Sequence, residues 1–231
     1  MKKIKSYQKI VLPLIFVIFI LALSGCFQIT QEFTHNSDGT GKLFVDFSIA
    51  KEMLNMGGDS QGTTTSPFAD WAKSDSPVKN DPNVLEVKTK DFEDDVNFHF
   101  TAEITFKDFE KGIKSLEKTK DKPDFKFEKL ANGNFKYTQL LKVNTGMPQQ
   151  ESPSTPGNQS AYQGQEGGKE DPLKDKFYTI KLTVPNPVKT DSSAVVDKKT
   201  GEILWKFPME EILKLKEPKE IWAEYSIKPA S

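Results

Sequence analysis

Few residues of this chain have the type and spacing that metal binding or catalysis requires. The histidines are His35 and His99, the single cysteine is Cys26, and acidic side chains cluster over residues 91–95. Structural zinc takes four closely spaced cysteine or histidine ligands, which these residues cannot supply. Calcium accepts carboxylate oxygens, but the acidic run lacks the spacing and the glycine of a calcium-binding loop. We therefore predict no metal site and interpret the acidic run as a solvated turn.

The familiar sequence signatures of enzymes are missing as well. The chain has no Gly-x-Ser-x-Gly elbow, no phosphate-binding loop and no dinucleotide fingerprint. All 32 basic residues are lysine, so the chain lacks the planar arginine side chain that favours bidentate binding of phosphate. We therefore predict that the protein is not an enzyme, that it has no catalytic residues and that it needs no cofactor.

Cys26 ends a distinctive N-terminal segment. A lysine-rich start is followed by an apolar run over residues 10–23, and residues 23–26 read Leu-Ser-Gly-Cys. This segment resembles a bacterial lipoprotein signal, whose lipobox consists of a leucine, two small residues and a cysteine. The resemblance implies that the signal, residues 1–25, is cleaved and that Cys26 becomes a diacylated N-terminus. The mature chain, residues 26–231, would then be anchored by lipid to the cell membrane and face the outside of the cytoplasm.

Other readings of this segment remain open. The apolar run is shorter than the ~20 residues that a membrane-spanning helix needs, and it contains Pro13. Its length suits the apolar region of a signal peptide, so an ordinary signal peptide, in which Cys26 has no special role, is the main alternative. If Cys26 is diacylated, the anchor is firm, because two acyl chains hold a protein stably where one binds only marginally.

The composition of the mature chain suits one domain with flexible segments. The signal contains four lysines and no acid, and the whole chain has a formal net charge of −1, so the mature chain is acidic. An acidic domain argues against a nucleic-acid partner. Because Cys26 is the only cysteine, no disulfide can form within the chain, and a core containing many of its 17 phenylalanines must supply the stability.

Alternating apolar and polar residues predict an antiparallel sheet built from hairpins. Turn signals such as Asp38-Gly39 and Asn132-Gly133 separate the runs, and the alternation over residues 96–106 places one face in the core and the other in water. We expect strands at 27–35 and 42–47, at 84–92 and 96–106, at 125–130 and 135–143, at 177–184, at 192–196 and 202–207, and at 221–227.

Two to four short helices accompany these strands. We expect them at 49–56 after the cap Ser48, from Phe109 after the cap Asp108, after Pro208, and in a short turn at Ser66-Pro67. The polar stretch 57–83 is predicted to be a loop, and the insert 144–172, rich in Gln, Ser, Gly and Pro, is predicted to be disordered. The result is a single α+β domain whose hairpin-rich antiparallel sheet contains strands from both sides of the insert and could curl around an apolar cavity.

The order of these elements resembles that of the LppM-like bacterial lipoproteins. The resemblance rests on Gly25-Cys26, on the Asp-Gly-Thr-Gly hairpin at 38–41 and on the late hairpin that contains Gly201, Ile203, Leu204 and Trp205. It implies a cell-envelope domain whose sheet and helices could enclose an apolar, lipid-binding cavity, and it brings no catalytic residues. LppM-like proteins commonly continue into a C-terminal transmembrane helix, for which this sequence has no apolar run, and the polar insert is a second departure.

Aromatic side chains are the candidate ligand-binding residues. Phe68 and Trp71 lie between two polar loops, where they could form a lid over an apolar pocket. Trp205 alternates with Phe207 as residues of an inward face do, so a place in the core is the alternative to a role in a cavity. Trp222 alternates with apolar neighbours and is expected to face outward, as a contact surface would.

Two functions fit these expectations. The first is a lipid-anchored, non-enzymatic cell-envelope protein that binds an apolar or amphipathic ligand such as a lipid. The second is an interaction module or adhesin that presents a surface to another envelope protein. In both, the membrane is a partner through the lipid on Cys26, and the sequence identifies no protein partner.

Overall fold

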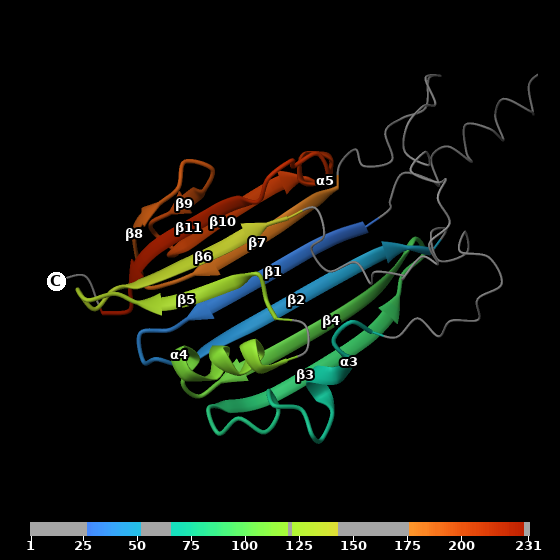
Figure 1. Ribbon diagram of the computed structural model, residues 1–231, viewed down its shortest axis with the longest axis horizontal. Helices are drawn as coiled ribbons and strands as arrows, with labels where there is room; N and C mark the ends of the chain where they lie inside the picture. The colour runs from blue at the N-terminus through green and yellow to red at the C-terminus, as the bar shows by residue number, and fades with distance from the viewer. Residues whose placement is uncertain (1–26, 52–65, 120–121, 143–175, 229–231) are drawn as a thin grey trace, which may run out of the picture.

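The computed structural model describes residues 27–51, 66–119, 122–142 and 176–228, which form two sheets and several short helices (Figure 1). One sheet contains β1 (Phe27–His35), β2 (Gly41–Ala50), β3 (Val84–Glu93), β4 (Asn97–Phe106), β7 (Phe177–Thr183), β9 (Val195–Asp197) and β10 (Glu202–Pro208). The other contains β5 (Phe125–Lys129), β6 (Phe135–Leu141), β8 (Asn186–Thr190) and β11 (Lys219–Ser226). The strand order is β3-β4-β2-β1-β7-β10-β9 in this large sheet and β5-β6-β11-β8 in the small sheet.

Hairpin pairing dominates both sheets, as the alternation predicts. The pairs β1–β2, β3–β4, β5–β6 and β9–β10 are antiparallel, whereas β1 and β7 run parallel. The pairs β1–β7 and β6–β11 join strands from both sides of segment 144–172, which confirms that these strands belong to common sheets. The α+β class is confirmed. The arrangement differs from the expectation in having two sheets and one parallel pair.

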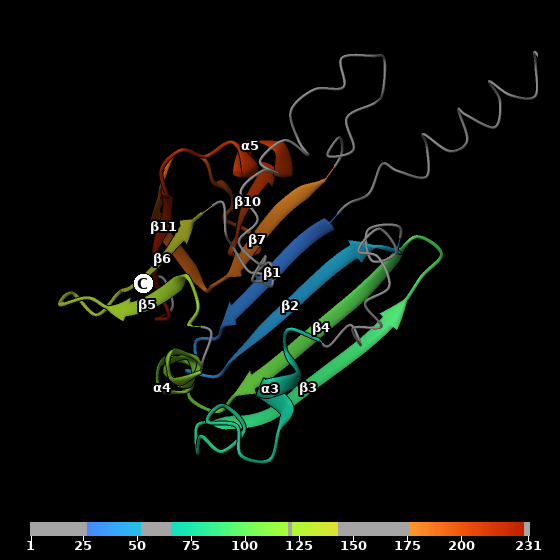
Figure 2. The same ribbon diagram turned by 45° about the vertical axis from the view of Figure 1, so that its right-hand side comes forward.

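Short helices pack against the large sheet beside the small sheet (Figure 2). α3 (Ala69–Ala72) lies against β3, and α4 (Phe109–Gly112) continues into the 3-10 helix η1 (Ile113–Lys118). The Asp108 Oδ1 atom accepts a hydrogen bond from the Lys111 backbone N–H at 3.1 Å, so the predicted cap is confirmed. α5 (Met209–Leu213) follows directly after Pro208, also as predicted.

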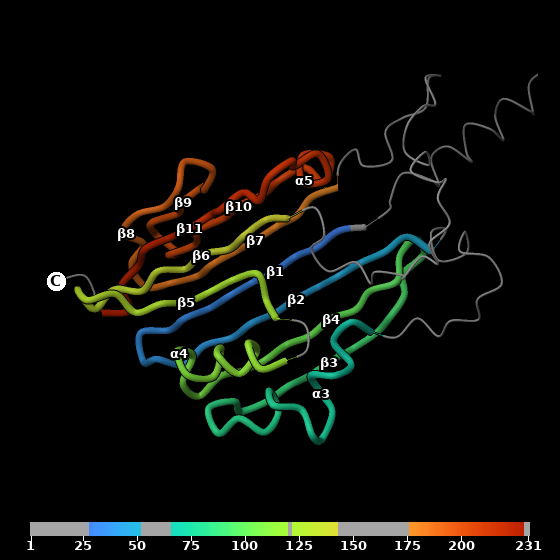
Figure 3. The backbone as a smooth tube through the Cα atoms, viewed as in Figure 1, coloured from blue at the N-terminus to red at the C-terminus, as the bar shows by residue number. Residues whose placement is uncertain are grey.

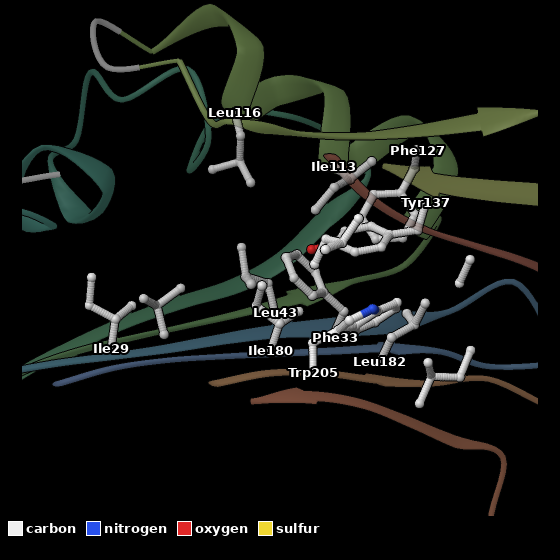
Figure 4. Packing of buried hydrophobic residues seen from close by; sticks show 14 of the residues in the cluster. Ile29, Phe33, Leu43, Ile113, Leu116, Phe127, Tyr137, Ile180, Leu182 and Trp205 are labelled. Carbon is white, nitrogen blue, oxygen red and sulfur yellow. The ribbon is translucent and has the colours of Figure 1, made fainter. Parts of the chain in front are cut away.

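Aromatic rings fill the space between the two sheets. The Phe33 ring of β1 lies 5.4 Å from the Phe127 ring and 5.4 Å from the Tyr137 ring (Figure 4), and 4.8 Å from the Phe125 ring. Tyr137 in turn lies 5.7 Å from the fully buried Trp205. Each fully buried ring of this kind stabilises the fold by roughly 1.5–3 kcal/mol. Between the sheets, these side chains occupy the place that an apolar cavity would need.

The helix expected at 49–56 does not begin where the sequence indicates. Ile49 and Ala50 belong to β2, where they pair with Phe98 and Asn97 of β4. Ile49 also pairs with β1. This strand pairing satisfies the backbone hydrogen-bonding groups and packs the side chains, and it outweighs the capping signal of Ser48. Residues 52–56 lie outside the described part of the chain.

Other differences concern irregular segments. Strand β8 was not expected, because Pro187 and polar neighbours hide its pattern; as the outer strand of the small sheet it can tolerate a proline. In the predicted loop 57–83, the described part buries Ser76 and Val78, so it packs on the core. Residues 57–65 and the insert 144–172 lie outside the described residues.

Two hairpin glycines offer a matched test of the fold. Gly133 has φ +85° with no atom within 4 Å of a built Cβ, whereas Gly201 has φ +74° and a Cβ there would lie 1.9 Å from the Val184 carbonyl oxygen. We predict that Gly133→Ala costs about 1–2 kcal/mol of unfolding free energy, the cost of the left-handed backbone alone. Gly201→Ala should cost at least about 3 kcal/mol, because the Val184 backbone must also move.

Urea unfolding of residues 27–231 measures both costs, and Gly133→Ala is the control for backbone strain. Equal destabilisation by the two substitutions would contradict the close approach of Gly201 to Val184.

Candidate functional site

A polar hollow opens at one end of the molecule. The β1–β2 turn and the β5–β6 turn lie at this end, together with the last described residues of the chain (Figure 3). The hollow measures about 210 Å³ and adjoins a second one of about 290 Å³; both are lined by Lys129, Phe135 and Ile227. His35, Asp38 and Asp108 also line the first. Titratable side chains and a concave surface therefore coincide here.

His35 forms the buried part of this hollow. It is the last residue of β1 and faces inward like Phe33, two positions before it, so its side chain is only 2% exposed. Its Nδ1 atom lies 2.9 Å from the Tyr225 hydroxyl of β11. Its ring lies 4.6 Å from the Phe109 ring and 4.8 Å from the Phe135 ring. The second ring nitrogen has no hydrogen-bond partner among the described residues.

Glycine opposite His35 makes this packing possible. Gly41 pairs with His35 across the β1–β2 hairpin, and a Cβ at Gly41 would lie 2.4 Å from the Phe109 ring. Because Gly41 has no side chain, the Phe109 ring can lie over the His35 imidazole. The same ring contact buries the histidine and shields it from water.

Burial keeps His35 neutral at physiological pH. It lowers the pKa of the imidazole from 6.5 to about 4, although the negative charges of Asp108 and Asp38 act in the opposite direction. A neutral imidazole has one donor and one acceptor nitrogen. With one nitrogen held by Tyr225, the other keeps its capacity to donate or accept a single hydrogen bond.

Charges of both signs surround His35 on the rim. Asp38 accepts hydrogen bonds from the hydroxyl and backbone N–H of Thr40, which lower its pKa, and the Asp108 carboxylate lies 2.8 Å from the Lys111 ammonium. Lys129 pairs loosely with Glu110 at 3.7 Å. Lys107 also lines the hollow, and no described residue forms an ion pair with it. The rim is therefore suited to a polar partner.

The second histidine lies on the outer face of the large sheet. His99 contacts the Asp46 carboxylate at 3.3 Å and the Asp94 carboxylate at 3.1 Å, and its ring stacks on Phe92 at 4.6 Å. Asp94 also accepts hydrogen bonds from the backbone N–H groups of residues 96 and 97, which lower its pKa and support the predicted turn. No group of three His, Cys, Asp or Glu side chains among the described residues could hold a metal ion.

The aromatic candidates Phe68 and Trp71 lie together, away from the hollow. Their ring centroids are 5.1 Å apart on α3 and the residue before it. Phe68 belongs to the core with 9% exposure, and Trp71 is partly buried against it. This pair therefore packs α3 onto the domain.

Trp205 and Trp222 meet at Asp191. The Trp205 indole N–H and the Trp222 backbone N–H each donate to Asp191 Oδ2 at 2.9 Å. Trp205 is fully buried, whereas Trp222 is partly exposed on the outer face of β11, with the Lys136 ammonium 5.6 Å from its ring. The outward orientation expected for Trp222 is confirmed. Asp191 thus ties β10 to β11, and Cys26, the remaining candidate, lies outside the described residues.

Sequence reasoning missed His35 as part of a site. Its alternation with Phe33 could have indicated burial. Tyr225, however, lies 190 residues further along the chain, and only the sheet topology brings the two side chains together.

Because its pKa is lowered, His35 should make the fold sensitive to acid. Above pH 6.5 the imidazole is neutral in both the folded and unfolded chain and has no effect; as the pH falls towards 4, only the unfolded chain gains the proton. We predict that wild type loses up to about 3 kcal/mol more stability over this interval than the His35→Gln variant does.

The unfolding free energy of both proteins is measured by urea unfolding at pH 7 and at pH 4.5. The loss between the two pH values is then compared between the proteins, so that a pH-independent cost of the substitution cancels. Identical losses for the two proteins would show that His35 is not held neutral by burial.

Comparison with known proteins gives a distant structural likeness. No protein-family model and no curated protein matches the chain. The folded domain of the LppM protein from Mycobacterium tuberculosis, solved by NMR, is similar over 88% of this chain and 91% of that domain, with 10% sequence identity and a TM-score of 0.42. A likeness at this level carries nothing about ligands or partners. Among the described residues, no helix is long and apolar enough to cross a bilayer.

Proposed function

We propose that this chain is a lipid-anchored, non-enzymatic cell-envelope protein whose domain works as an interaction module. The observation that carries the proposal is the polar hollow around His35, which leaves one buried ring nitrogen without a partner among the described residues. A buried polar group without a hydrogen bond is costly, so a partner that supplies this bond gains affinity.

The position of β1 would set the distance of the hollow from the membrane. The lipobox cysteine, Cys26, immediately precedes β1, and His35 is the last of the nine residues of that strand. A strand advances about 3.4 Å per residue, so the two ends of β1 are about 27 Å apart. A lipid on Cys26 would therefore hold the hollow away from the membrane, where a protein or other polar partner can reach it.

The surroundings of His35 favour binding over catalysis. Its hydrogen-bond partner is the Tyr225 hydroxyl, and burial raises the pKa of that phenol well above its ordinary value. A phenol that holds its proton so firmly is a poor nucleophile. No serine, threonine or cysteine of the described chain is hydrogen-bonded to His35, so the arrangement supports recognition.

A second candidate is binding of an apolar or amphipathic ligand, such as a lipid. It is favoured by the inner face of the large sheet beyond the small sheet, where Phe47, Ile49 and Phe98 are only partly buried. Phe47 stacks on Phe100 at 6.2 Å in the same region. A lipid chain would lie against these side chains and not in the hollow, so the two candidates place their ligands at different ends of the domain.

Site-specific photocrosslinking in cells tests the first candidate. We predict that a photoreactive residue at Lys129, on the rim, gives one discrete crosslinked product, because Lys129 lines both parts of the hollow and its side chain is 55% exposed. The protein should be found in the membrane fraction, and Cys26→Ser should release it and reduce the crosslinking.

Val195 provides the matched control, because it is 69% exposed on β9 and does not line the hollow. A product that forms equally well from position 195 would speak against recognition at the hollow. Retention of Cys26→Ser in the membrane fraction would speak against the lipid anchor.

A further inference from the structure

We infer that the end of the large sheet at which β1 begins rests on the membrane surface, where lysines paired with phenylalanine rings contact the lipid headgroups. The inference rests on the proposed lipidation of Cys26. It assigns a membrane-contact surface to this domain and thereby fixes its orientation.

The anchor is attached to the sheet without a linker. Phe27, the first residue of β1, directly follows Cys26, and neighbouring Cα atoms are about 3.8 Å apart. Because the backbone of Phe27 is already paired with that of Ile49 in β2, it cannot swing away from the sheet. The lipid therefore holds the start of β1 close to the bilayer.

Several strand ends meet at this anchored end, shown on the right of Figure 1. Ile49 pairs with Phe98 at the start of β4, and Phe177 at the start of β7 pairs with Pro208 at the end of β10. Helix α5 continues from Pro208, so it lies at the same end.

Lysine side chains lie over phenylalanine rings at this end. The Lys51 ammonium lies 5.5 Å from the centroid of the Phe98 ring, the Lys206 ammonium lies 3.8 Å from that of Phe177, and the Lys219 ammonium lies 4.4 Å from that of Phe207. The described chain forms five such lysine–phenylalanine pairs and one lysine–tryptophan pair, and three of the five are these.

Two of these lysines are available to bind an anionic headgroup. Lys51 forms an ion pair with Glu93 at 3.2 Å, whereas no described residue forms an ion pair with Lys206 or Lys219. A lysine can lay its carbon chain on an apolar surface and keep its ammonium in the polar layer, where lipid phosphates lie. Lys206 and Lys219 are therefore the expected headgroup contacts.

Some acidic groups near this end are paired within the protein, whereas Glu211 on α5 and Glu217 and Glu220, which flank Lys219, are exposed beside the proposed contact. The β3–β4 turn, with Glu93 and Asp94, lies at the outer edge of the sheet, three strands from β1. Glu93 is paired with Lys51 and Asp94 with His99, and on α5 Glu210 is paired with Lys214. The contact is thus centred on β1, β7 and β10.

Lysine acetylation footprinting tests the inference on the full lipidated protein. The protein is reconstituted in vesicles of phosphatidylglycerol and phosphatidylethanolamine, and the Cys26→Ser protein is treated in solution for comparison. We expect acetylation of Lys206 and Lys219 to fall several-fold on the vesicles. Lys107 and Lys129, which line the hollow at the opposite end, should react equally in both samples.

The intact mass of the reconstituted protein separates the two claims. A mass without the diacyl modification overturns the proposed lipid anchor, and the inference with it. A lipidated protein in which Lys206 and Lys219 react as in solution, or in which Lys107 and Lys129 are protected instead, overturns the inference and leaves the anchor intact.

Discussion

The edge-to-face and tilted packing of aromatic rings between the two sheets is the interaction on which the rest of this structure depends. Phe33 extends from the centre of the large sheet into a group of rings carried by the small sheet, and Tyr137 continues the contact to Trp205. Chain segments far apart in sequence meet here: β1, β5, β6 and β10. Without this layer the small sheet would have no fixed place, and the hollow that lies between the two sheets at their end would not exist.

Buried polar side chains set the register of that layer. Gln139 is 1% exposed, and its amide donates to Gln31 and to the Tyr178 hydroxyl at 2.9 Å each, while Tyr137 donates to its carbonyl oxygen. Because a buried polar group without a hydrogen bond destabilises the fold, these contacts favour one alignment of the two sheets. His35 belongs to the same interface but keeps one nitrogen unsatisfied within the described chain, which is why it stands out as a place for a partner.

Local sequence patterns predicted most of the hairpins. They predicted little of how the hairpins assemble into sheets. The turn at Gly133 and the cap at Asp108 follow from short-range chemistry, and both are where the sequence indicated. The parallel pairing of β1 with β7 and the contact of His35 with Tyr225 depend on distant segments, for which one sequence carries no signal. The predicted start of the helix at Ile49 was wrong, because β2 has a neighbour on each side and continues to Ala50; Lys51 is the first helical residue, so tertiary pairing overrode a local cap.

The central claim is that the space between the sheets is filled by the protein's own rings, so that recognition takes place on the surface. Native mass spectrometry of residues 27–231, produced in bacteria without the signal and followed by organic extraction, tests this most directly. The account predicts the mass of the bare protein, before and after incubation with membrane lipids. A lipid-sized mass that co-purifies with the protein, appears in the organic extract and persists when Phe47 and Phe98 on the open face of the large sheet are replaced by serine would contradict it, because that lipid would have to lie between the sheets.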